Sequence, residues 1–182
     1  LFLPFAFLTV RAYTRTTVDS REDIERLTRV PILGVVGHHS GGDRMVVAHK
    51  PKSAIAEAFR SIRANLMFLG LSEKHKTILV TSSVGGEGKS FTTLNLAAVL
   101  ALQHHKVVIL GMDLRKPQLF RELAVSNENG LSKLLTGQSR LNEVICTTSI
   151  EGLDLIPSGP VPPNPSELLA KTEVGELLAE LG

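Results

Sequence analysis

Residues 77–110, TILVTSSVGGEGKSFTTLNLAAVLALQHHKVVIL, decide how this chain folds. Two short aliphatic runs without alternation, at 77–81 and 107–110, indicate strands that are covered on both faces. Between them, residues 89–103 form an apolar pattern without Gly or Pro, which predicts a helix. A strand, a Gly-rich turn, a helix and a second strand make a right-handed βαβ unit, so the sequence predicts a parallel α/β sheet.

The turn before this helix has the composition of a phosphate-binding loop. Backbone amides converge on phosphate oxygens only where the chain curls tightly, and residues without a Cβ allow this. Lys89 would place an ammonium against the outer phosphates, Ser90 would offer a hydroxyl to Mg²⁺, and the helix start favours an anion. Ser83 replaces the first Gly of the pattern G-x-x-x-x-G-K-[ST], and an ordinary Gly-rich turn is the alternative. The residues expected to bind nucleotide are Gly85, Gly86, Glu87, Gly88, Lys89, Ser90 and Phe91.

An acidic residue follows the second predicted strand, in the stretch VVILGMDLRKP at 107–117. Because the carboxyl ends of parallel strands meet at one edge of a sheet, Asp113 is expected to overhang the same crevice as the phosphate loop. There it would hold Mg²⁺ and accept a hydrogen bond from an attacking hydroxyl. A helix cap after the strand is the alternative interpretation for Asp113. Arg115 would either steady phosphate charge or pair with Asp113.

The composition is that of an ordinary soluble domain. The 182 residues are 43% hydrophobic and 21% charged, which excludes a disordered or disulfide-stapled chain. The formal net charge of +2 does not call for a nucleic-acid partner. Cys146 is the only cysteine, so no intrachain disulfide forms and a reducing compartment is expected.

The N-terminal region predicts a membrane attachment. Residues 1–10, LFLPFAFLTV, are apolar and precede Arg11 and Arg15, which indicates the cytoplasmic end of a transmembrane helix over 1–12. A buried strand is the alternative. Residues 13–50 are expected to form a juxtamembrane linker, with a short helix that starts at Ser20 and is supported by Asp23. The globular domain is expected to cover 51–182.

Further elements are predicted within that domain. Residues 53–69 have one apolar helical stripe, formed by Ile55, Phe59, Ile62, Leu66 and Leu69. A third strand is expected at 153–156, and Asn164-Pro165 indicates the start of a helix that runs toward Gly182.

Four motifs in this order resemble one known family. They are EAFRSIRANLMF (57–68), TSSVGGEGKSFTTLNLA (81–97), LGMDLRKP (110–117) and LIPSGPVPPNPSELL (155–169). The chain is similar over nearly its whole length to the cytoplasmic domain of bacterial tyrosine autokinases of capsule and exopolysaccharide export. The resemblance implies a P-loop NTPase-like fold with three αβα layers and a mostly parallel sheet, incomplete at the C-terminus. It also implies ATP and Mg²⁺ as cofactors and an inner-membrane protein whose kinase domain faces the cytoplasm.

The resemblance carries roles to individual residues. Lys89 and Ser90 match the Walker A residues on the phosphates and on Mg²⁺, and Asp113 matches the second Asp of the Walker A′ element, linked to Mg²⁺ and to activation of the tyrosine hydroxyl. The remaining matches form the E-x-x-R-x-x-R motif, through which similar proteins assemble into a homo-oligomeric ring that presents the tyrosine tail of a neighbouring subunit: Glu57, Arg60 and Arg63. A solvated helical face is the alternative for these three residues.

The chain also departs from the family pattern. Gly111 stands where the Walker A′ element usually has a further Asp, so a carboxylate is missing. No apolar strand ending in Asp follows Leu181, so the Walker B element and the tyrosine-rich tail are expected outside this chain, which we interpret as a fragment. Tyr13, the only tyrosine, is expected to anchor at the membrane interface.

Three functions are compatible with these features. The first is an ATP-dependent tyrosine autokinase that regulates polysaccharide polymerisation and acts with the export machinery. The second is an ATP-switched ATPase of the partition type, although such proteins carry a Lys near the start of the loop where this chain has Val84. The third is a nucleotide-binding scaffold without catalysis, which the missing carboxylate at Gly111 favours.

Overall fold

The computed structural model describes residues 20–71 and 76–182. The chain divides into two compact units, Leu1–Ile32 and Leu33–Gly182. The expected membrane-helix end at 1–12, together with Tyr13 and Arg15, lies outside the described residues. Among the residues that are described, no helix has the length and apolar character needed to cross a bilayer.

The first unit contains helix α2 (Arg21–Leu27). The Asp23 amide donates to the Ser20 hydroxyl at 3.2 Å, and the Ser20 amide donates to the Asp23 carboxylate at 3.1 Å. This reciprocal capping box pairs amides that the helix itself leaves free. The predicted helix start at Ser20 is therefore confirmed.

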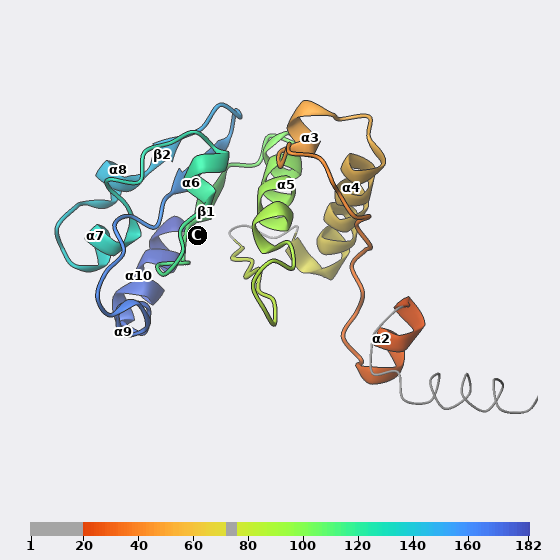
Figure 1. Ribbon diagram of the computed structural model, residues 1–182, viewed down its shortest axis with the longest axis horizontal. Helices are drawn as coiled ribbons and strands as arrows, with labels where there is room; N and C mark the ends of the chain where they lie inside the picture. The colour runs from red at the N-terminus through yellow and green to blue at the C-terminus, as the bar shows by residue number, and fades with distance from the viewer. Residues whose placement is uncertain (1–19, 72–75) are drawn as a thin grey trace, which may run out of the picture. The chain divides into compact units, whose positions relative to one another are not determined.

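The second unit contains a three-stranded mixed sheet (Figure 1). β1 (Val107–Leu110) pairs in parallel with β3 (Leu153–Ile156), with Val107 opposite Leu153. β2 (Cys146–Thr147) pairs with the other edge of β3 in the antiparallel direction. The strands predicted at 107–110 and 153–156 are confirmed, and the short β2 is an addition to them.

Helices cover both faces of the sheet, as Figure 1 shows, so the predicted three-layer α/β architecture is confirmed. Ile109 and Leu155 contribute to one hydrophobic core, whereas Ile156 contributes to the other, because alternate residues of a strand point to opposite faces. The first core is covered by α3 (Val46–His49), α4 (Ala54–Leu66) and α5 (Lys89–Ala101). The helices near the second core are α7 (Leu131–Leu135), α8 (Leu141–Val144), α9 (Pro165–Leu169) and α10 (Thr172–Leu181).

The apolar stripe predicted along α4 is correct except at its end. Phe59, Ile62 and Leu66 are buried in the first core. Leu69 is 61% exposed, so its expected place in the stripe is wrong. The α-helix ends at Leu66 and continues as the wider turn η1 (Met67–Leu71), in which Gly70 has a φ of 96°. This change of winding rotates Leu69 away from the core.

The single helix expected from Pro165 to Gly182 is in fact two helices. α9 ends at Leu169 and α10 begins at Thr172, with Lys171 in an extended conformation between them. In one continuous helix, Leu168 and Leu177 would lie about 180° apart. The break allows both leucines to be buried in the second core.

The strand predicted at 77–81 is not formed within the described chain. These residues have no strand partner, and Leu79 is 79% exposed. One edge of β1 pairs with β3, while a cavity separates its other edge from the segment at 76–80. An aliphatic run becomes a strand only where a neighbour pairs with its N–H and C=O groups, and here that neighbour is lacking.

Residues 33–50, which we expected to serve as a linker, belong to the second compact unit. Met45 and Val47 are buried in the first core. The Asn65 side chain of α4 donates a hydrogen bond to the Leu33 carbonyl at 2.6 Å. This segment is therefore packed on α4 and α5 in the globular unit, and the observed division lies at Ile32 rather than near Lys50.

Candidate functional site

The Gly-rich loop before α5 adopts a curled conformation that depends on glycine. Gly86 and Gly88 have φ angles of 91° and 95°, a region that residues with a Cβ rarely occupy. Gly88 caps α5 without a side-chain hydrogen bond. Within residues 20–71 and 76–182, no hydrogen bond takes up the amides of residues 85–91. The loop therefore presents a run of free N–H donors at a helix N-terminus, which is the arrangement that binds phosphate.

The Lys89 ammonium lies over this loop. Its Nζ donates to the Ser82 hydroxyl at 2.8 Å and to the Val84 carbonyl at 3.4 Å. These bonds fold the half-buried side chain back across the loop. Ser82 was not predicted as a functional residue, although its place at the start of the loop was a usable signal.

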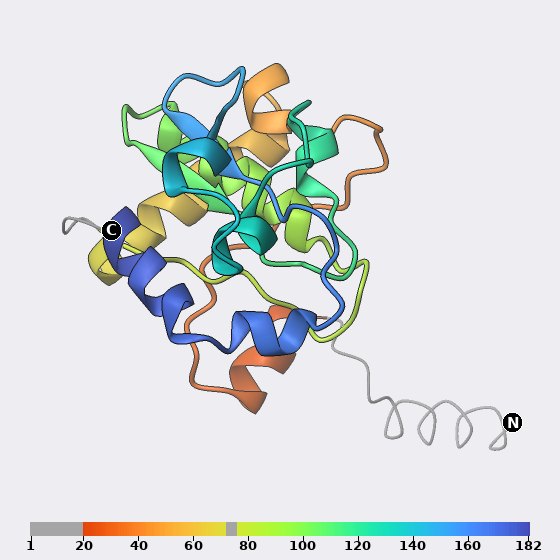
Figure 2. The same ribbon diagram turned by 90° about the vertical axis from the view of Figure 1, so that its left-hand side faces the viewer.

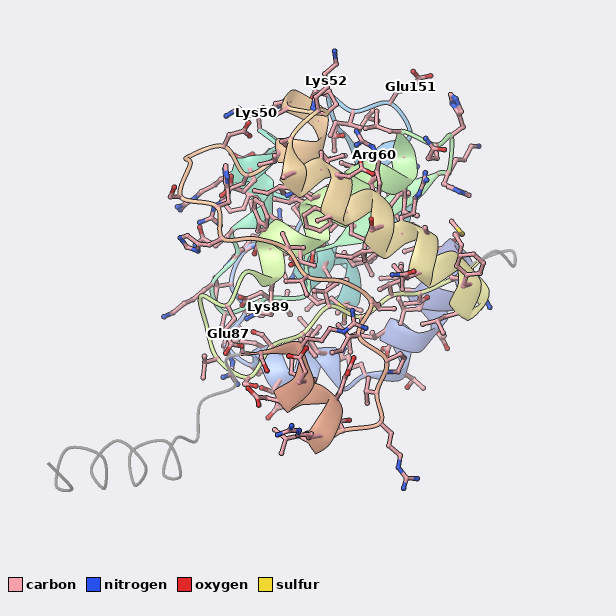
Figure 3. All side chains as sticks on the ribbon, turned by 90° about the vertical axis from the view of Figure 1, so that its right-hand side faces the viewer. Lys50, Lys52, Arg60, Glu87, Lys89 and Glu151 are labelled. Carbon is pink, nitrogen blue, oxygen red and sulfur yellow. The ribbon has the colours of Figure 1, made fainter. Side chains whose placement is uncertain are left out.

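Glu87 shapes the first part of the loop. Its Oε2 atom accepts hydrogen bonds from the amides of Ser83 and Val84, at 2.9 and 3.2 Å. Figure 3 shows Glu87 and Lys89 on the same loop. The carboxylate thus occupies two donors of the loop entrance and leaves those of residues 85–91 open. Its predicted contact with nucleotide remains a prediction.

Asp113 closes a tight turn after β1. Its Oδ1 atom accepts from the amides of Arg115 and Lys116, at 3.1 and 2.9 Å, so Asp113 caps a turn and not the helix that the alternative interpretation expected. Asp113 is nevertheless exposed. The Arg115 guanidinium donates to the Ser166 hydroxyl at 2.8 Å, an interaction that neither of our interpretations of Arg115 included.

The two loops border one cavity of about 820 Å³ between α5 and the free edge of β1. Lys89 and Ser90 line it from the first loop, and Asp113 and Lys116 line it from the second. The structure thus brings together Lys89, Ser90 and Asp113, three of the eight residues that the sequence proposed for nucleotide and metal contacts. Lys116, which adds a second cation, was missed, although it lies beside Arg115 in the motif.

These residues fit a nucleotide with Mg²⁺. Mg²⁺ in such sites is held by one or two protein oxygens together with phosphates and water. The Ser90 hydroxyl and the Asp113 carboxylate offer such oxygens beside the amides of 85–91. No group of three or more His, Cys, Asp or Glu residues in the described chain is arranged to hold a metal without phosphates.

Gly111 is packed too closely for a side chain. A Cβ at this position would lie 2.8 Å from the Ser158 amide nitrogen and 2.9 Å from its hydroxyl. The Ser158 hydroxyl donates to the Gly111 carbonyl at 2.7 Å, inside the protein. The missing carboxylate of the Walker A′ element is therefore replaced by a close backbone contact with the end of β3.

Phe91 faces the protein interior rather than the cavity. Its ring stacks on His39 with centroids 5.6 Å apart, and it meets Phe59 at 6.0 Å. Only its backbone amide belongs to the free donors of the loop. A nucleotide contact by the Phe91 side chain is not supported by this packing.

The expected assembly residues lie on α4. Arg60 donates to Glu57 at 2.6 Å and also to the Pro51 carbonyl. Glu57 is exposed, whereas Arg60 and Arg63 are half-buried. In the single chain, the first two residues therefore pair along the helix surface. Their role between subunits remains a prediction.

Comparisons with known proteins agree with this site. The family described as an AAA domain matches residues 75–173. The tyrosine-protein kinase YwqD of Bacillus subtilis (strain 168) is 38% identical over 143 residues, which cover 76% of this chain and 60% of YwqD. The putative tyrosine-protein kinase CapB of Staphylococcus aureus is 37% identical over 75% of this chain and 60% of its own length. The chain thus spans about 60% of these curated relatives.

Solved structures show the same relationship. The kinase domain of the Escherichia coli tyrosine kinase ETK superposes with a TM-score of 0.82 and 30% identity, over 91% of this chain and 69% of that one. The chimerical protein CapA2B2 superposes with a TM-score of 0.80 and 40% identity, over 89% of this chain and 70% of that one. The fold and the sequence therefore point to the same group of proteins.

Proposed function

We propose that this chain is the nucleotide-binding part of an ATP-dependent tyrosine autokinase. The chain belongs to the AAA-domain family and, within it, to the bacterial tyrosine kinase domains. One observation carries this proposal. Lys89 and Ser90, which directly follow the Gly-rich turn with its free amides, line the same cavity as Asp113. The similarity to named tyrosine kinases favours this function over the partition-type ATPase.

Catalysis would consist of positioning and charge neutralisation. The amides of 85–91 and Lys89 would hold the β- and γ-phosphates of ATP, and the ammonium would offset charge on the transferring phosphoryl group. Lys89 must leave its bonds to Ser82 and Val84 to do so. Asp113 would accept the hydrogen bond of the attacking tyrosine hydroxyl, and its place is fixed by the turn that it caps.

Ser90 and Asp113 would hold Mg²⁺. When bound, the ion supplies charge neutralisation between the phosphates. Ser90 lies in α5 and Asp113 follows β1, so the two oxygens come from different elements that line the cavity. Gly111 supplies no further carboxylate, which leaves Asp113 to serve both the metal and the hydroxyl.

The test is the change Lys89→Met in the full-length protein. We expect phosphotyrosine to disappear, because the phosphates lose their fixed cation. Lys52→Met is a matched control, because Lys52 lies at the opposite end of α4 and α5 from the loop (Figure 3). Undiminished phosphotyrosine in the Lys89 variant would contradict the proposal.

We further propose a homo-oligomer assembled through α4, in which a neighbouring subunit offers its tyrosine tail. The support is the exposed Glu57 and the half-buried Arg60 and Arg63 on one helix. Replacing all three by Ala should lower the mass measured by light scattering and reduce transfer between subunits. An unchanged mass would leave these residues as a solvated surface.

The proposed location is the inner membrane, with this domain in the cytoplasm beside the polysaccharide export machinery. The support is the apolar run at 1–10 followed by Arg11 and Arg15, and the similarity to a putative tyrosine-protein kinase in a cps region of Klebsiella pneumoniae, 34% identical over 134 residues. Fractionation of cells that express the full-length protein would test the location.

A scaffold without catalysis is the second candidate, and the packing of Gly111 against Ser158 favours it because one carboxylate is absent. The two functions differ in one measurement. A scaffold binds ATP but releases no γ-phosphate over long incubation, whereas the kinase transfers it to tyrosine.

A further inference from the structure

Asn95 ties an early segment of the chain to the phosphate-loop helix. The residue lies within α5 and its side chain is 0% exposed. Its Nδ2 donates to the Arg44 carbonyl at 2.7 Å and to the Phe91 carbonyl at 2.8 Å, while its Oδ1 accepts from the Val47 amide at 2.9 Å. Both amide hydrogens and the oxygen are therefore paired. Loss of this side chain would leave buried backbone groups without partners.

A second contact joins the same segment to the start of α5. The His39 ring stacks on Phe91, with 23° between the ring planes, and Phe91 directly follows Ser90. Asn95 bonds to the carbonyl of that same Phe91. The two contacts thus hold the first turn of α5, from which the free amides and Ser90 project.

The segment at 39–49 is itself well ordered by local bonds. His39 donates to the Asp43 carbonyl at 2.9 Å, and the Met45 amide and His49 ring donate to the Asp43 carboxylate at 3.0 Å each. The Nε atom of Arg44 lies 3.3 Å from the Oε1 atom of Glu122. Glu122 belongs to α6 (Leu119–Glu122), the helix that follows the Asp113 turn. The segment therefore reaches the elements beside both loops of the cavity.

The phosphate loop depends on α5 for its position. Its side-chain hydrogen bonds in the described chain run between residues 82–89, and a Cβ on Gly85, Gly86 or Gly88 would meet nothing within 4 Å. The loop therefore has little packing of its own. A fixed first turn of α5 is what keeps its amides converged.

We propose that Asn95 is a positioning residue that couples docking of the segment 39–49 to nucleotide binding by the phosphate loop. The inference rests on the proposed function, because the loop must bind nucleotide. When the segment 39–49 is docked on α5, it fixes the first turn of α5 and raises the affinity for nucleotide. By thermodynamic reciprocity, nucleotide strengthens docking by the same factor. The segment 39–49 can in this way influence the phosphate loop without touching the ligand.

The experiment measures hydrogen exchange and ADP binding on the full-length protein with Mg²⁺. Saturating ADP should slow exchange of the Val47 amide about fivefold or more, the lower end of ordinary coupling. In Asn95→Ser, ADP should bind about fivefold more weakly, and its effect on the exchange of residues 44–49 should disappear. Asn65→Ser is the matched control, because Asn65 holds Leu33, which lies before the segment 39–49, and does so from α4 instead of α5. This variant should keep the wild-type affinity for ADP, and ADP should still slow the exchange of its Val47 amide.

The outcomes separate the two proposals. ADP binding with unchanged Val47 exchange in the wild type overturns the coupling and leaves the proposed function standing. Wild-type affinity in a folded Asn95→Ser protein also overturns it. No ADP binding by the wild type overturns the proposed function and the coupling together. If Asn95→Ser fails to fold, two other measurements still test the coupling. One is the exchange of the wild-type Val47 amide with ADP. The other is the ADP affinity of His39→Ala, which removes the stack on Phe91 and should bind ADP more weakly than the wild type.

Discussion

The two loops that border the cavity are held in opposite ways. In the phosphate loop, Gly86 and Gly88 have positive φ angles, no atom lies within 4 Å of where their Cβ would be, and the amides of 85–91 are free. In the turn after β1, Gly111 touches Ser158, and Asp113 pairs with two amides of its own turn. An aliphatic run precedes each loop, but only the run at 107–110 is paired in a sheet.

The difference agrees with the roles that we propose for the two loops. A loop that wraps an anion needs unpaired donors, and these stay solvated at low cost while they are exposed. A carboxylate that must stand at one place needs a rigid turn and a paired strand behind it. Substitutions should therefore affect ligand binding in the first loop and also stability in the second.

The largest effect is expected at Gly88. Val at this position must adopt a φ near 95°, which costs a β-branched residue about 1–2 kcal/mol or more. The loop amides would leave their converged arrangement, and we expect autophosphorylation to fall about 1,000-fold, as when preorganised donors are lost. Labelling with γ-phosphate measures this. Gly85→Ala, at a position without positive φ and with open space, is the control. Comparable loss in both variants would show that the φ angle is not the reason.

Asp113→Asn separates turn structure from charge. The amide oxygen still accepts the two turn hydrogen bonds, so the melting temperature should be nearly unchanged. Without the carboxylate, activation of the hydroxyl is lost and transfer should fall about 100-fold. Autophosphorylation over a range of Mg²⁺ concentrations measures this. Glu151→Gln, an exposed carboxylate away from the loop, is the control (Figure 3). Full activity of Asp113→Asn would sink the assignment.

Gly111→Ala tests the close packing of the second loop. The new Cβ would meet the Ser158 amide at 2.8 Å, and such overpacking costs about 1–3 kcal/mol. Chemical denaturation measures the loss. Gly175→Ala is the control, and it should raise the free energy of unfolding instead of lowering it. Nothing lies within 4 Å of where a Cβ at this position in α10 would be, and Ala stabilises a helix by about 0.5–1 kcal/mol over Gly. Equal stability of Gly111→Ala and wild type would contradict the packing argument.

Asp43, like Glu87 and Asp113, is a carboxylate that accepts a backbone hydrogen bond, and its substitution should have a smaller effect on stability. Partial burial raises its pKa, but hydrogen bonds from His49 and the Met45 amide outweigh this, so the pKa lies below the ordinary 3.8. The resulting stability is fully present above pH 3.8 and is lost as the pH falls through the lowered pKa. Asp43→Asn should cost at most about 1 kcal/mol at pH 7, and the difference from wild type should shrink in acid. A difference that grows in acid would reverse the sign of this argument.

Much of the site could be predicted because its signals are contiguous. The loop glycines, Lys89, Ser90 and Asp113 occur in two short motifs, and Lys89, Ser90 and Asp113 line one cavity even though the run before the first motif is not paired as a strand. Ser158 and Asn95 could not be found in this way. Their importance depends on backbone groups at Gly111, Arg44 and Val47, which no local pattern places beside them.

The arrangement of the helices shows the same limit. Figure 2, turned by 90° from Figure 1, shows the helices of 165–181 on the side that faces the viewer. The break between α9 and α10 and the outward turn of Leu69 both depend on which neighbours the helices meet. Periodicity alone predicted one long helix and one unbroken stripe, because it counts residues and not contacts.

The amino-acid order by itself determined the phosphate loop, the helix that follows it and the cap at Ser20, since each depends on residues that are close in the chain. It also predicted the aliphatic runs at 107–110 and 153–156, whose pairing with each other joins distant parts of the chain. Only the tertiary structure decided that the run at 77–81 stays unpaired, that residues 33–50 pack on α4 and α5, and that position 111 has no room for a side chain. These three outcomes depend on partners that are distant in sequence, and hydrogen bonding and packing energies arise only when such partners meet.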